Sequence, residues 1–334
     1  MIFLACFLLS LYLSLNIVED KPLSNLIERG EEMRVIKERV EPSELKYLKF
    51  LKPRRGLTIK ENQYYLKLLK GFKGEKEFDR LIQQELTADC LVLNGLLFEH
   101  SLTVFQIDTL LIFQNDVYLI EIKYFEGDFY TDDEQWHVIS GKEIKNPLLQ
   151  IQRSESTFRQ MQQSLKLDYT VKASLVFNNP EFHLYNASSD LPVIFPAQLY
   201  RFVKRLNDVP TEISQKHEQF ADHLVSRHLT DSPHTRVPDY DYDQLKKGVV
   251  CPKCLSFLSQ KESKWVCNKC GNMEERADAI LRTVNEFQFL FPNKKLTTKT
   301  ICDWCGIVQG YKTVRRILNK HFNRIGNTNN SYFV

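Results

Sequence analysis

Two C-x-x-C pairs near the C-terminal end constrain the fold of this chain more than any other sequence feature. Cys251 and Cys254 form the first pair, and after twelve intervening residues Cys267 and Cys270 form the second. Four thiolates spaced in this way give a closed tetrahedral zinc site, so we expect the zinc to be structural. Zinc binding supplies folding free energy, which lets a short segment with little core of its own hold a fold. A redox dithiol is the alternative interpretation.

The remaining cysteines favour a reducing compartment. The chain has 334 residues and eight cysteines, and a secreted disulfide scaffold would be shorter and richer in cysteine. Cys302 and Cys305 form a third C-x-x-C pair within a predicted helix, but no second pair is left to complete a site, so we expect them to be small core residues. Cys90 is expected to be a buried small residue. This pattern predicts a cytoplasmic protein.

The apolar head, residues 1–32, has two interpretations. Residues 1–18 are long enough for a short membrane anchor, and the basic residues that follow would keep the body in the cytoplasm. Alternatively, the head is an over-extended start, because residues 28–32 are encoded by purine-rich codons like a ribosome-binding site and Met33 follows at once. A cleaved signal is disfavoured because no Lys or Arg precedes the apolar run. Both remaining interpretations leave the rest of the chain in the cytoplasm.

Positive charge is concentrated in two blocks although the formal net charge is only +3. Residues 33–73 carry 12 Lys and Arg against 4 Asp and Glu, and residues 287–334 carry 8 against 1. Local fields of this kind attract phosphate. Five cations of the first block form either a solvated face or a phosphate-contacting entry to a cleft, namely Lys46, Lys49, Lys52, Arg54 and Arg55.

Residues 71–208 alternate helical and strand patterns, which is α/β order. A helix is predicted to begin near Gly74, because apolar residues recur at helical spacing from Phe78 to Leu86. Further helices are predicted over 146–165 and 197–206, and strands over 103–113, 117–125, 171–177 and 191–195. Trp136 and His137 fall in a polar stretch that we interpret as a structural or substrate-side loop.

The predicted hairpin over 103–125 brings acidic residues together. If Asn115 and Asp116 form its turn, Asp108 lies opposite Lys123 and diagonal to Glu121, with the backbones about 7–8 Å apart. Alternation places Glu121 and Lys123 on one face of their strand.

Such a group has two interpretations. Asp108 and Glu121 could hold Mg²⁺ (or Mn²⁺), and Lys123 could activate water or stabilise charge on phosphate. The alternative is a solvated ion pair at a strand end, worth about 0–1 kcal/mol.

A family resemblance supports the first interpretation. The segments that carry it are Gly71-Phe72-Lys73-Gly74-Glu75, Gln106-Ile107-Asp108, Glu121-Ile122-Lys123, and Asn146-Pro147 with Gln150. Over roughly residues 65–180 the chain resembles the nuclease-related domain (NERD) family of the PD-(D/E)xK superfamily. The resemblance implies a restriction-endonuclease-like mixed sheet flanked by helices. It also implies that Asp108 and Glu121 are metal ligands, Lys123 is the catalytic lysine, and Glu75 and Gln150 orient them. Glu77 lies on the same helix as Glu75, so the choice between them depends on glycine spacing.

Residues 276–334 are predicted to form a winged helix-turn-helix. Helices are expected over 279–291, 298–306 and 311–322, followed by a wing hairpin over 324–334. The third helix buries an apolar face and carries cations at i, i+3, i+4 and i+8 on the other side, which is typical of a recognition helix. The predicted DNA-binding residues are Lys312, Arg315, Arg316, Lys320 and Arg324. The alternative is a solvated helix face.

Residues 249–272 resemble topoisomerase-type and other zinc ribbons.

Together these features predict an α/β (α+β) protein with six segments. They are the apolar head (1–32), a basic segment (33–70), the nuclease-like domain (71–208), a helix with an acidic linker (209–248), the zinc ribbon (249–272) and the winged helix (273–334). The expected function is metal-dependent endonuclease cleavage of DNA. The alternative is a non-catalytic DNA-binding regulator or docking protein that retains a degenerate nuclease fold. RNA is a second candidate substrate, a homodimer is a candidate assembly, and a membrane is a partner only if the apolar head is genuine.

Overall fold

The computed structural model describes residues 32–133, 135–233, 235–261, 264–307, 310–327 and 331–334. The first 31 residues of the apolar head lie outside these ranges. Within them, no helix combines the length and the hydropathy that a membrane crossing needs.

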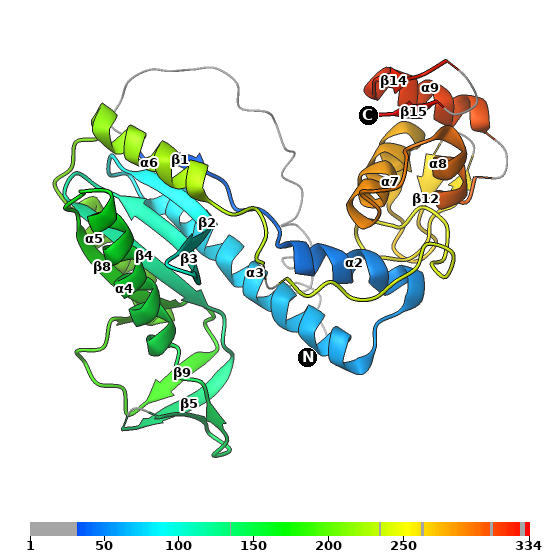
Figure 1. Ribbon diagram of the computed structural model, residues 1–334. Helices are drawn as coiled ribbons and strands as arrows, with labels where there is room; N and C mark the ends of the chain where they lie inside the picture. The colour runs from blue at the N-terminus through cyan, green and yellow to red at the C-terminus, as the bar shows by residue number, and fades with distance from the viewer. Residues whose placement is uncertain (1–31, 134, 234, 262–263, 308–309, 328–330) are drawn as a thin grey trace, which may run out of the picture. The chain divides into compact units, whose positions relative to one another are not determined.

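A six-stranded mixed sheet forms the centre of the N-terminal half, as the sequence predicted (Figure 1). Its strand order is β1-β2-β3-β4-β8-β10. The pairs β2/β3 and β3/β4 are antiparallel, and the pairs β1/β2, β4/β8 and β8/β10 are parallel. The strands are β1 Arg34–Lys37, β2 Leu91–His100, β3 Thr103–Ile112, β4 Asp116–Lys123, β8 Thr170–Phe177 and β10 Val193–Ile194.

Helices cover both faces of this sheet because its central strands are apolar on both sides. On one face, Phe78 and Val203 share a buried core with Ile120. On the other face, Phe158 and Phe220 share a second core with strand residues. The side chains of these strand residues point to the opposite side of the sheet from those in the first core. The covering helices are α3 (Ile59–Glu85) and α5 (Leu199–Asn207, preceded by the 3₁₀ turn Pro196–Gln198) on the first face, and α4 (Leu148–Ser164) and α6 (Gln215–Arg227) on the second.

Helix α3 begins much earlier than the predicted start near Gly74. Thr58 caps it, because the main-chain N–H of Glu61 donates to Thr58 Oγ1 at 3.2 Å and the N–H of Thr58 donates to Glu61 Oε2 at 2.8 Å. The preceding helix α2 (Ser43–Arg55) packs on α3 through Leu45 and Leu48. The extra turns were missed because their apolar residues pack on α2 and not on the sheet.

The β3–β4 turn consists of Gln114 and Asn115. It is closed by the main-chain N–H of Phe113, which donates to the carbonyl of Asp116 at 2.9 Å. The predicted turn, Asn115 and Asp116, was therefore wrong by one residue, and each predicted cross-strand pair is shifted by two. Asp116 starts β4, and its carboxylate pairs with Lys172 of β8 at 2.7 Å.

A four-stranded sheet of order β7-β6-β5-β9 follows the central hairpin in the chain. Its strands are β5 Gly127–Asp132, β6 Gln135–Val138, β7 Glu143–Ile144 and β9 Phe182–Tyr185. Trp136 and His137 lie in β6, so the predicted loop was wrong. Trp136 is buried against Phe177, with ring centroids 5.9 Å apart, because apolar residues on one side of these short strands need their own small core.

The C-terminal half has one continuous core. Val249 and Trp265 from the cysteine-rich segment share it with Phe287 and Trp304 from the helices that follow. Cys302 and Cys305 are also buried there. The elements are β11 Ser259–Lys261, β12 Lys264–Val266, β13 Met273–Glu275, α7 Arg276–Leu290, α8 Thr298–Trp304, α9 Tyr311–His321, β14 Arg324–Ile325 and β15 Tyr332–Phe333.

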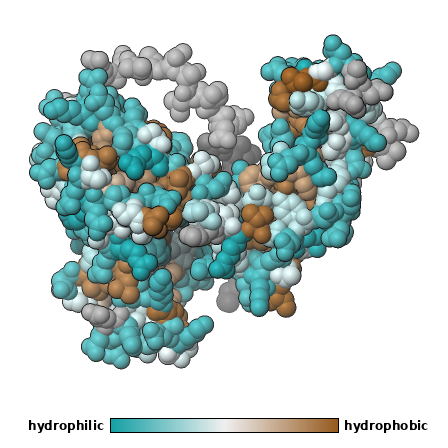
Figure 2. All heavy atoms as spheres, in the orientation of Figure 1, coloured by the Kyte–Doolittle hydropathy of each residue, from teal (hydrophilic) through white to brown (hydrophobic). Residues whose placement is uncertain are grey.

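The described surface is mainly polar. Figure 2 shows a largely hydrophilic face on which hydrophobic side chains gather in small, separate patches. Scattered apolar patches of this kind are normal for a protein whose apolar residues are mostly in its cores.

Candidate active site

Asp108 lies in β3, just beyond the last pair of the β3–β4 ladder, and it is 5% exposed. Its Oδ2 accepts a hydrogen bond from the main-chain N–H of Ile122 at 2.8 Å, and its Oδ1 accepts from Gln106 Nε2 at 3.0 Å. The carboxylate thus accepts a hydrogen bond from a main-chain N–H that would otherwise donate within the β3–β4 ladder. In the observed register Asp108 lies beside Glu121, whereas the sequence had placed it opposite Lys123.

Glu121, Lys123 and Gln150 form one hydrogen-bonded group. Lys123 Nζ contacts Glu121 Oε1 at 2.5 Å, and it also donates to Gln150 Oε1 at 2.9 Å. Gln150 Nε2 donates to the same Glu121 oxygen at 2.5 Å. Strand alternation puts Glu121 and Lys123 on one face of β4, and Gln150 comes from the first turn of α4, which packs on that face. Three residues that the sequence singled out are therefore together.

Glu75 reaches the cluster from α3. A Cβ added at the preceding residue, Gly74, would lie 2.6 Å from Tyr124 Cβ, so only glycine lets α3 approach the end of β4 this closely. Asn178 also contacts α3 at this position, because its Nδ2 donates to the carbonyl of Gly74 at 2.6 Å. Glu77 instead faces Lys73, at 3.6 Å. The helix acid at the cluster is thus Glu75.

The carboxylates of the cluster interact strongly. Burial and the charge of Asp108 raise the pKa of Glu121 to about 8, although the ammonium of Lys123 opposes this shift. Burial and the charge of Asp108 likewise raise the pKa of Glu75 to about 7, although Arg39 opposes the shift. Buried acids that repel one another lose their cost when a cation binds between them.

The donor set fits a hard divalent cation. Asp108 and Glu121 offer carboxylate oxygens, which Mg²⁺ prefers, and the site is built from strand ends rather than mobile loops. Within the described residues, only the four cysteines bring three or more ligand atoms within 4.8 Å of one another. The carboxylates of the acidic cluster are therefore not gathered as closely as the four cysteines.

Two residues of this cluster were missed from the sequence. Arg39 and Asp79 form a buried ion pair next to Glu75. Asp79 had a detectable signal, because it lies four residues after Glu75 and so shares its helix face. Arg39 had none, because it is one of twelve cations in a basic segment and 36 residues from Glu75.

The interpretation of the N-terminal cations was wrong for Arg54. It is neither solvated nor free to contact phosphate, because its side chain is 0% exposed and bonds to Glu286 at 2.7 Å. Lys49 pairs with Glu41 at 3.0 Å and Arg55 with Glu61 at 2.6 Å.

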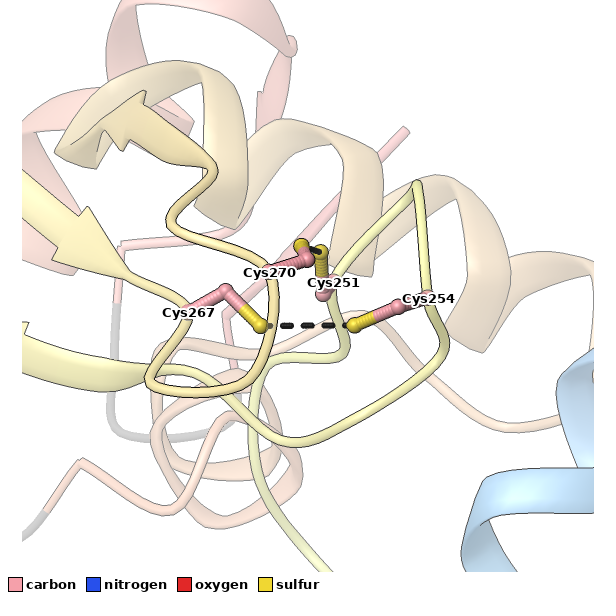
Figure 3. A group of neighbouring side chains, drawn as sticks. All are labelled: Cys251, Cys254, Cys267 and Cys270. Atoms are coloured by element: carbon pink, nitrogen blue, oxygen red, sulfur yellow. Dashed lines mark hydrogen bonds between the residues drawn. The ribbon is translucent and has the colours of Figure 1, made fainter. Parts of the chain in front are cut away.

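The four predicted zinc ligands converge on one point (Figure 3). The Sγ atoms of Cys251 and Cys270 are 3.6 Å apart, and those of Cys254 and Cys267 are 3.3 Å apart. Hydrogen bonds from Ser256 lower the pKa of Cys254 to about 6, which favours its thiolate. The hydrogen bond with Asn272 acts to lower the pKa of Cys270, but burial and the neighbouring thiols outweigh it and raise this pKa to about 12. Within the part of the chain that the structure describes, the group consists of four sulfur ligands, which match a closed structural zinc site.

The predicted basic helix forms as α9. It buries Val314, Ile317 and Leu318 and contains no acidic residue. All five predicted DNA-contacting cations are exposed, namely Lys312, Arg315, Arg316, Lys320 and Arg324. The short β14–β15 ribbon follows the helix, at the position predicted for a wing.

Comparison with known proteins supports the N-terminal assignment. The family model described as "Nuclease-related domain" (NERD) matches residues 70–178. Comparisons with curated proteins and with solved structures gave no significant match. The match spans Glu75, Asp108, Glu121, Lys123 and Gln150, and it contains the four middle strands of the mixed sheet, whereas β1 and β10 lie outside it. Residues 70–178 are therefore a nuclease-related domain.

Proposed function

We propose that this protein is a metal-dependent nuclease that hydrolyses phosphodiester bonds of DNA, with Mg²⁺ or Mn²⁺ as its cofactor. The observation that supports this best is the convergence of Asp108 and Glu121, both buried and acidic, beside Lys123. Burial of a charged carboxylate costs free energy unless a cation neutralises it, and the internal cations do not neutralise all of these acids. Such a group at a strand end is typical of a functional site.

Asp108 and Glu121 would hold the cation, which supplies Lewis-acid stabilisation of charge and a more acidic water when it is bound. Lys123, held by Gln150 at 2.9 Å, would exchange its contact with Glu121 for the phosphate oxygen or the attacking water. Glu75 would orient groups in the outer coordination sphere, and Gln150 would fix the carboxylate of Glu121.

The C-terminal half would bind the DNA. The exposed cations of α9 can contact phosphates, and a helix of this kind after a short turn fits a major groove. The zinc site would stabilise this module, because Cys251 and Cys267 are part of the core that supports α7 and α8. This gives the protein a winged-helix DNA-binding region joined to a nuclease-related domain.

Cleavage is tested with the full-length, zinc-loaded chain on supercoiled, linear and branched DNA and on RNA, with Mg²⁺ or Mn²⁺. We expect metal-dependent cutting of DNA that is abolished by Asp108→Asn. Glu77→Gln is the matched control, because Glu77 lies on α3 outside the cluster and should leave cutting unchanged. Cutting that persists in Asp108→Asn would contradict the assigned site. DNA binding without cutting by the wild type would favour the regulator alternative.

DNA binding is tested separately by fluorescence anisotropy at several salt concentrations. Arg315→Ala/Arg316→Ala should weaken binding and lower the slope of log K against log salt by about 0.9 for each phosphate that the variant no longer neutralises. The control is Arg201→Ala/Lys204→Ala, which removes two exposed cations from α5. Equal losses in the two double variants would mean that α9 has no special role.

A further inference from the structure

Arg39 lies inside the acidic cluster although it comes from outside the matched residues 70–178. It follows β1, and its side chain is 2% exposed. Its Nη1 donates to Glu75 Oε2 at 2.7 Å, and its Nη2 donates to the main-chain carbonyl of Asp108 at 2.7 Å. One guanidinium therefore contacts the helix acid and the backbone of a candidate metal ligand.

The guanidinium is itself held rigidly. Asp79 accepts from Nε at 2.8 Å and from Nη2 at 2.9 Å, which is a bidentate pair. Nη2 also donates to Thr109 Oγ1 at 2.9 Å, and that hydroxyl donates to Asn94 Oδ1 at 3.1 Å. Each of these partners lies on α3, β2 or β3, so the orientation of Arg39 is determined by the sheet and the long helix together.

We propose that Arg39 is a positioning residue of the nuclease site, which sets the orientation of Glu75 and the place of Asp108 in β3. This inference rests on the proposed function. On the β2 side of β3, Asn94 pairs with Thr109 and Leu96 pairs with Ile107, but no Gly95–Asp108 pair forms between them, and the carbonyl of Asp108 accepts its hydrogen bond from Arg39 instead. The functional unit would then extend upstream of the matched domain to β1.

Geometry explains why the residue is arginine. Its planar fork presents five donors in fixed directions, and here it reaches Asp79, Glu75, Thr109 and the Asp108 carbonyl at once. A lysine at the same position would retain the charge but only one donor nitrogen. A purely structural ion pair would require only Asp79. The hydrogen bonds to Glu75 and Asp108 are what tie Arg39 to the site.

The test compares Arg39→Lys and Asp79→Asn with the wild type in the full-length, zinc-loaded chain. Mn²⁺ affinity is measured by calorimetry, kcat and KM by DNA cleavage, and folding by circular dichroism. We expect a 10–100-fold loss in Mn²⁺ affinity or kcat for Arg39→Lys, with KM for DNA unchanged. Asp79→Asn should give a smaller loss in the same direction. Arg34→Ala is the control, because Arg34 pairs with Glu218 on the surface.

The outcomes separate this inference from the proposed function. If the wild type binds Mn²⁺ and cuts DNA while a folded Arg39→Lys does both equally well, the inference is wrong and the proposed function stands. If the wild type binds Mn²⁺ without cutting, the proposed function fails, and weaker Mn²⁺ binding by Arg39→Lys still supports the inference. If the wild type does not bind Mn²⁺ at the cluster, both are wrong. Should Arg39→Lys not fold, a folded Asp79→Asn with wild-type metal affinity and kcat would also overturn the inference.

Discussion

Gln150 donates a hydrogen bond from its amide nitrogen to Oε1 of Glu121 over 2.5 Å. The amide oxygen of the same side chain accepts from Lys123 at 2.9 Å, so its two ends serve a carboxylate and an ammonium. An amide can satisfy both needs at once, whereas a carboxylate or an ammonium can satisfy only one. Gln150 therefore determines how the two charged groups of β4 face the site.

Gln150→Leu removes both hydrogen bonds while it retains similar volume. We expect DNA cleavage to fall by about 10–100-fold, as is usual when an orienting partner of a metal ligand is removed. Gln152→Leu is the matched control, because Gln152 is exposed on the same helix. Cleavage rates for the two variants decide the matter, and equal rates would show that Gln150 does not orient the site.

The raised carboxyl pKa values predict how cation binding depends on pH. The cation needs Glu121 deprotonated, and in the metal-free protein the pKa of this group is about 8. We therefore expect the apparent Mn²⁺ affinity at the cluster to rise as pH increases from 6 to 8 and then to level off, with protons released on binding. Calorimetry in buffers of different ionisation enthalpy measures both quantities. An affinity that is flat over this range would contradict the assignment.

The same groups predict the pH dependence of stability without a divalent cation. Burial raises the pKa of Glu121 from 4.5 in the unfolded chain to about 8 in the folded protein. Between these values the folded state binds more protons than the unfolded state, so the free energy of unfolding falls as pH rises. Glu121→Gln should remove this part of the pH dependence, whereas Glu77→Gln should not. Urea denaturation of the full-length, zinc-loaded chain without added Mg²⁺ or Mn²⁺, at pH 5 and pH 8, would measure it.

The two glycines of α3 should respond differently to alanine. At Gly74 the new Cβ would lie 2.6 Å from Tyr124, so we expect destabilisation by about 1–3 kcal/mol from overpacking, and loss of cleavage as Glu75 moves. At Gly71 nothing lies within 4 Å, and alanine in a helix interior should stabilise by up to about 1 kcal/mol. Thermal unfolding and cleavage of both variants check this. A tolerated Gly74→Ala would mean that the approach of α3 is not tight.

Zinc removal should affect the whole C-terminal module and not only the ribbon. Trp265 between the cysteine pairs shares a core with Phe287 of α7 and Trp304 of α8. We expect one zinc per chain, and strong chelation should increase hydrogen exchange in α7 and α8. Cys267→Ser should reproduce this loss, whereas Cys302→Ala should retain the zinc. A second zinc that disappears in Cys302→Ala would contradict the core assignment of that cysteine.

Features that depend on short spacing could be predicted from the sequence. The ligands of a zinc ribbon come from two tight turns, so the spacing of Cys251, Cys254, Cys267 and Cys270 was enough to place them together. Strand alternation placed Glu121 and Lys123 on one face for the same reason. These geometries are determined within a few residues by backbone dihedrals.

Features that depend on register or tertiary packing could not be predicted. The β3–β4 turn is closed at Phe113, so the turn lies one residue earlier than the predicted Asn-Asp turn. The predicted and observed registers differ by two residues and keep each side chain on the same sheet face, so hydrophobic alternation could not distinguish them. Arg39 and Arg54 looked alike in a basic segment, yet each is buried against a carboxylate far along the chain. No local pattern marks which cation of such a segment will find a buried partner.

Arg54 and Glu286 provide the last prediction. Arg54 is 0% exposed, and it also donates to the carbonyls of Lys246 and Gly248 and lies 3.8 Å from the ring centroid of Trp304. Arg54→Met leaves the carboxylate of Glu286 buried and unpaired, which should cost about 3–5 kcal/mol. Arg54→Met/Glu286→Leu should recover most of this loss, because the pair is then replaced by apolar side chains, although the two carbonyls still lack their donor.

Urea denaturation followed by tryptophan fluorescence compares these two variants with the wild type. Because Arg54 is enclosed, the double variant should bind DNA as the wild type does once it is folded. A folded double variant with much weaker DNA affinity would show that Arg54 does contact phosphate. A single variant as stable as the wild type would show that the pair contributes nothing to holding α2 on the C-terminal core.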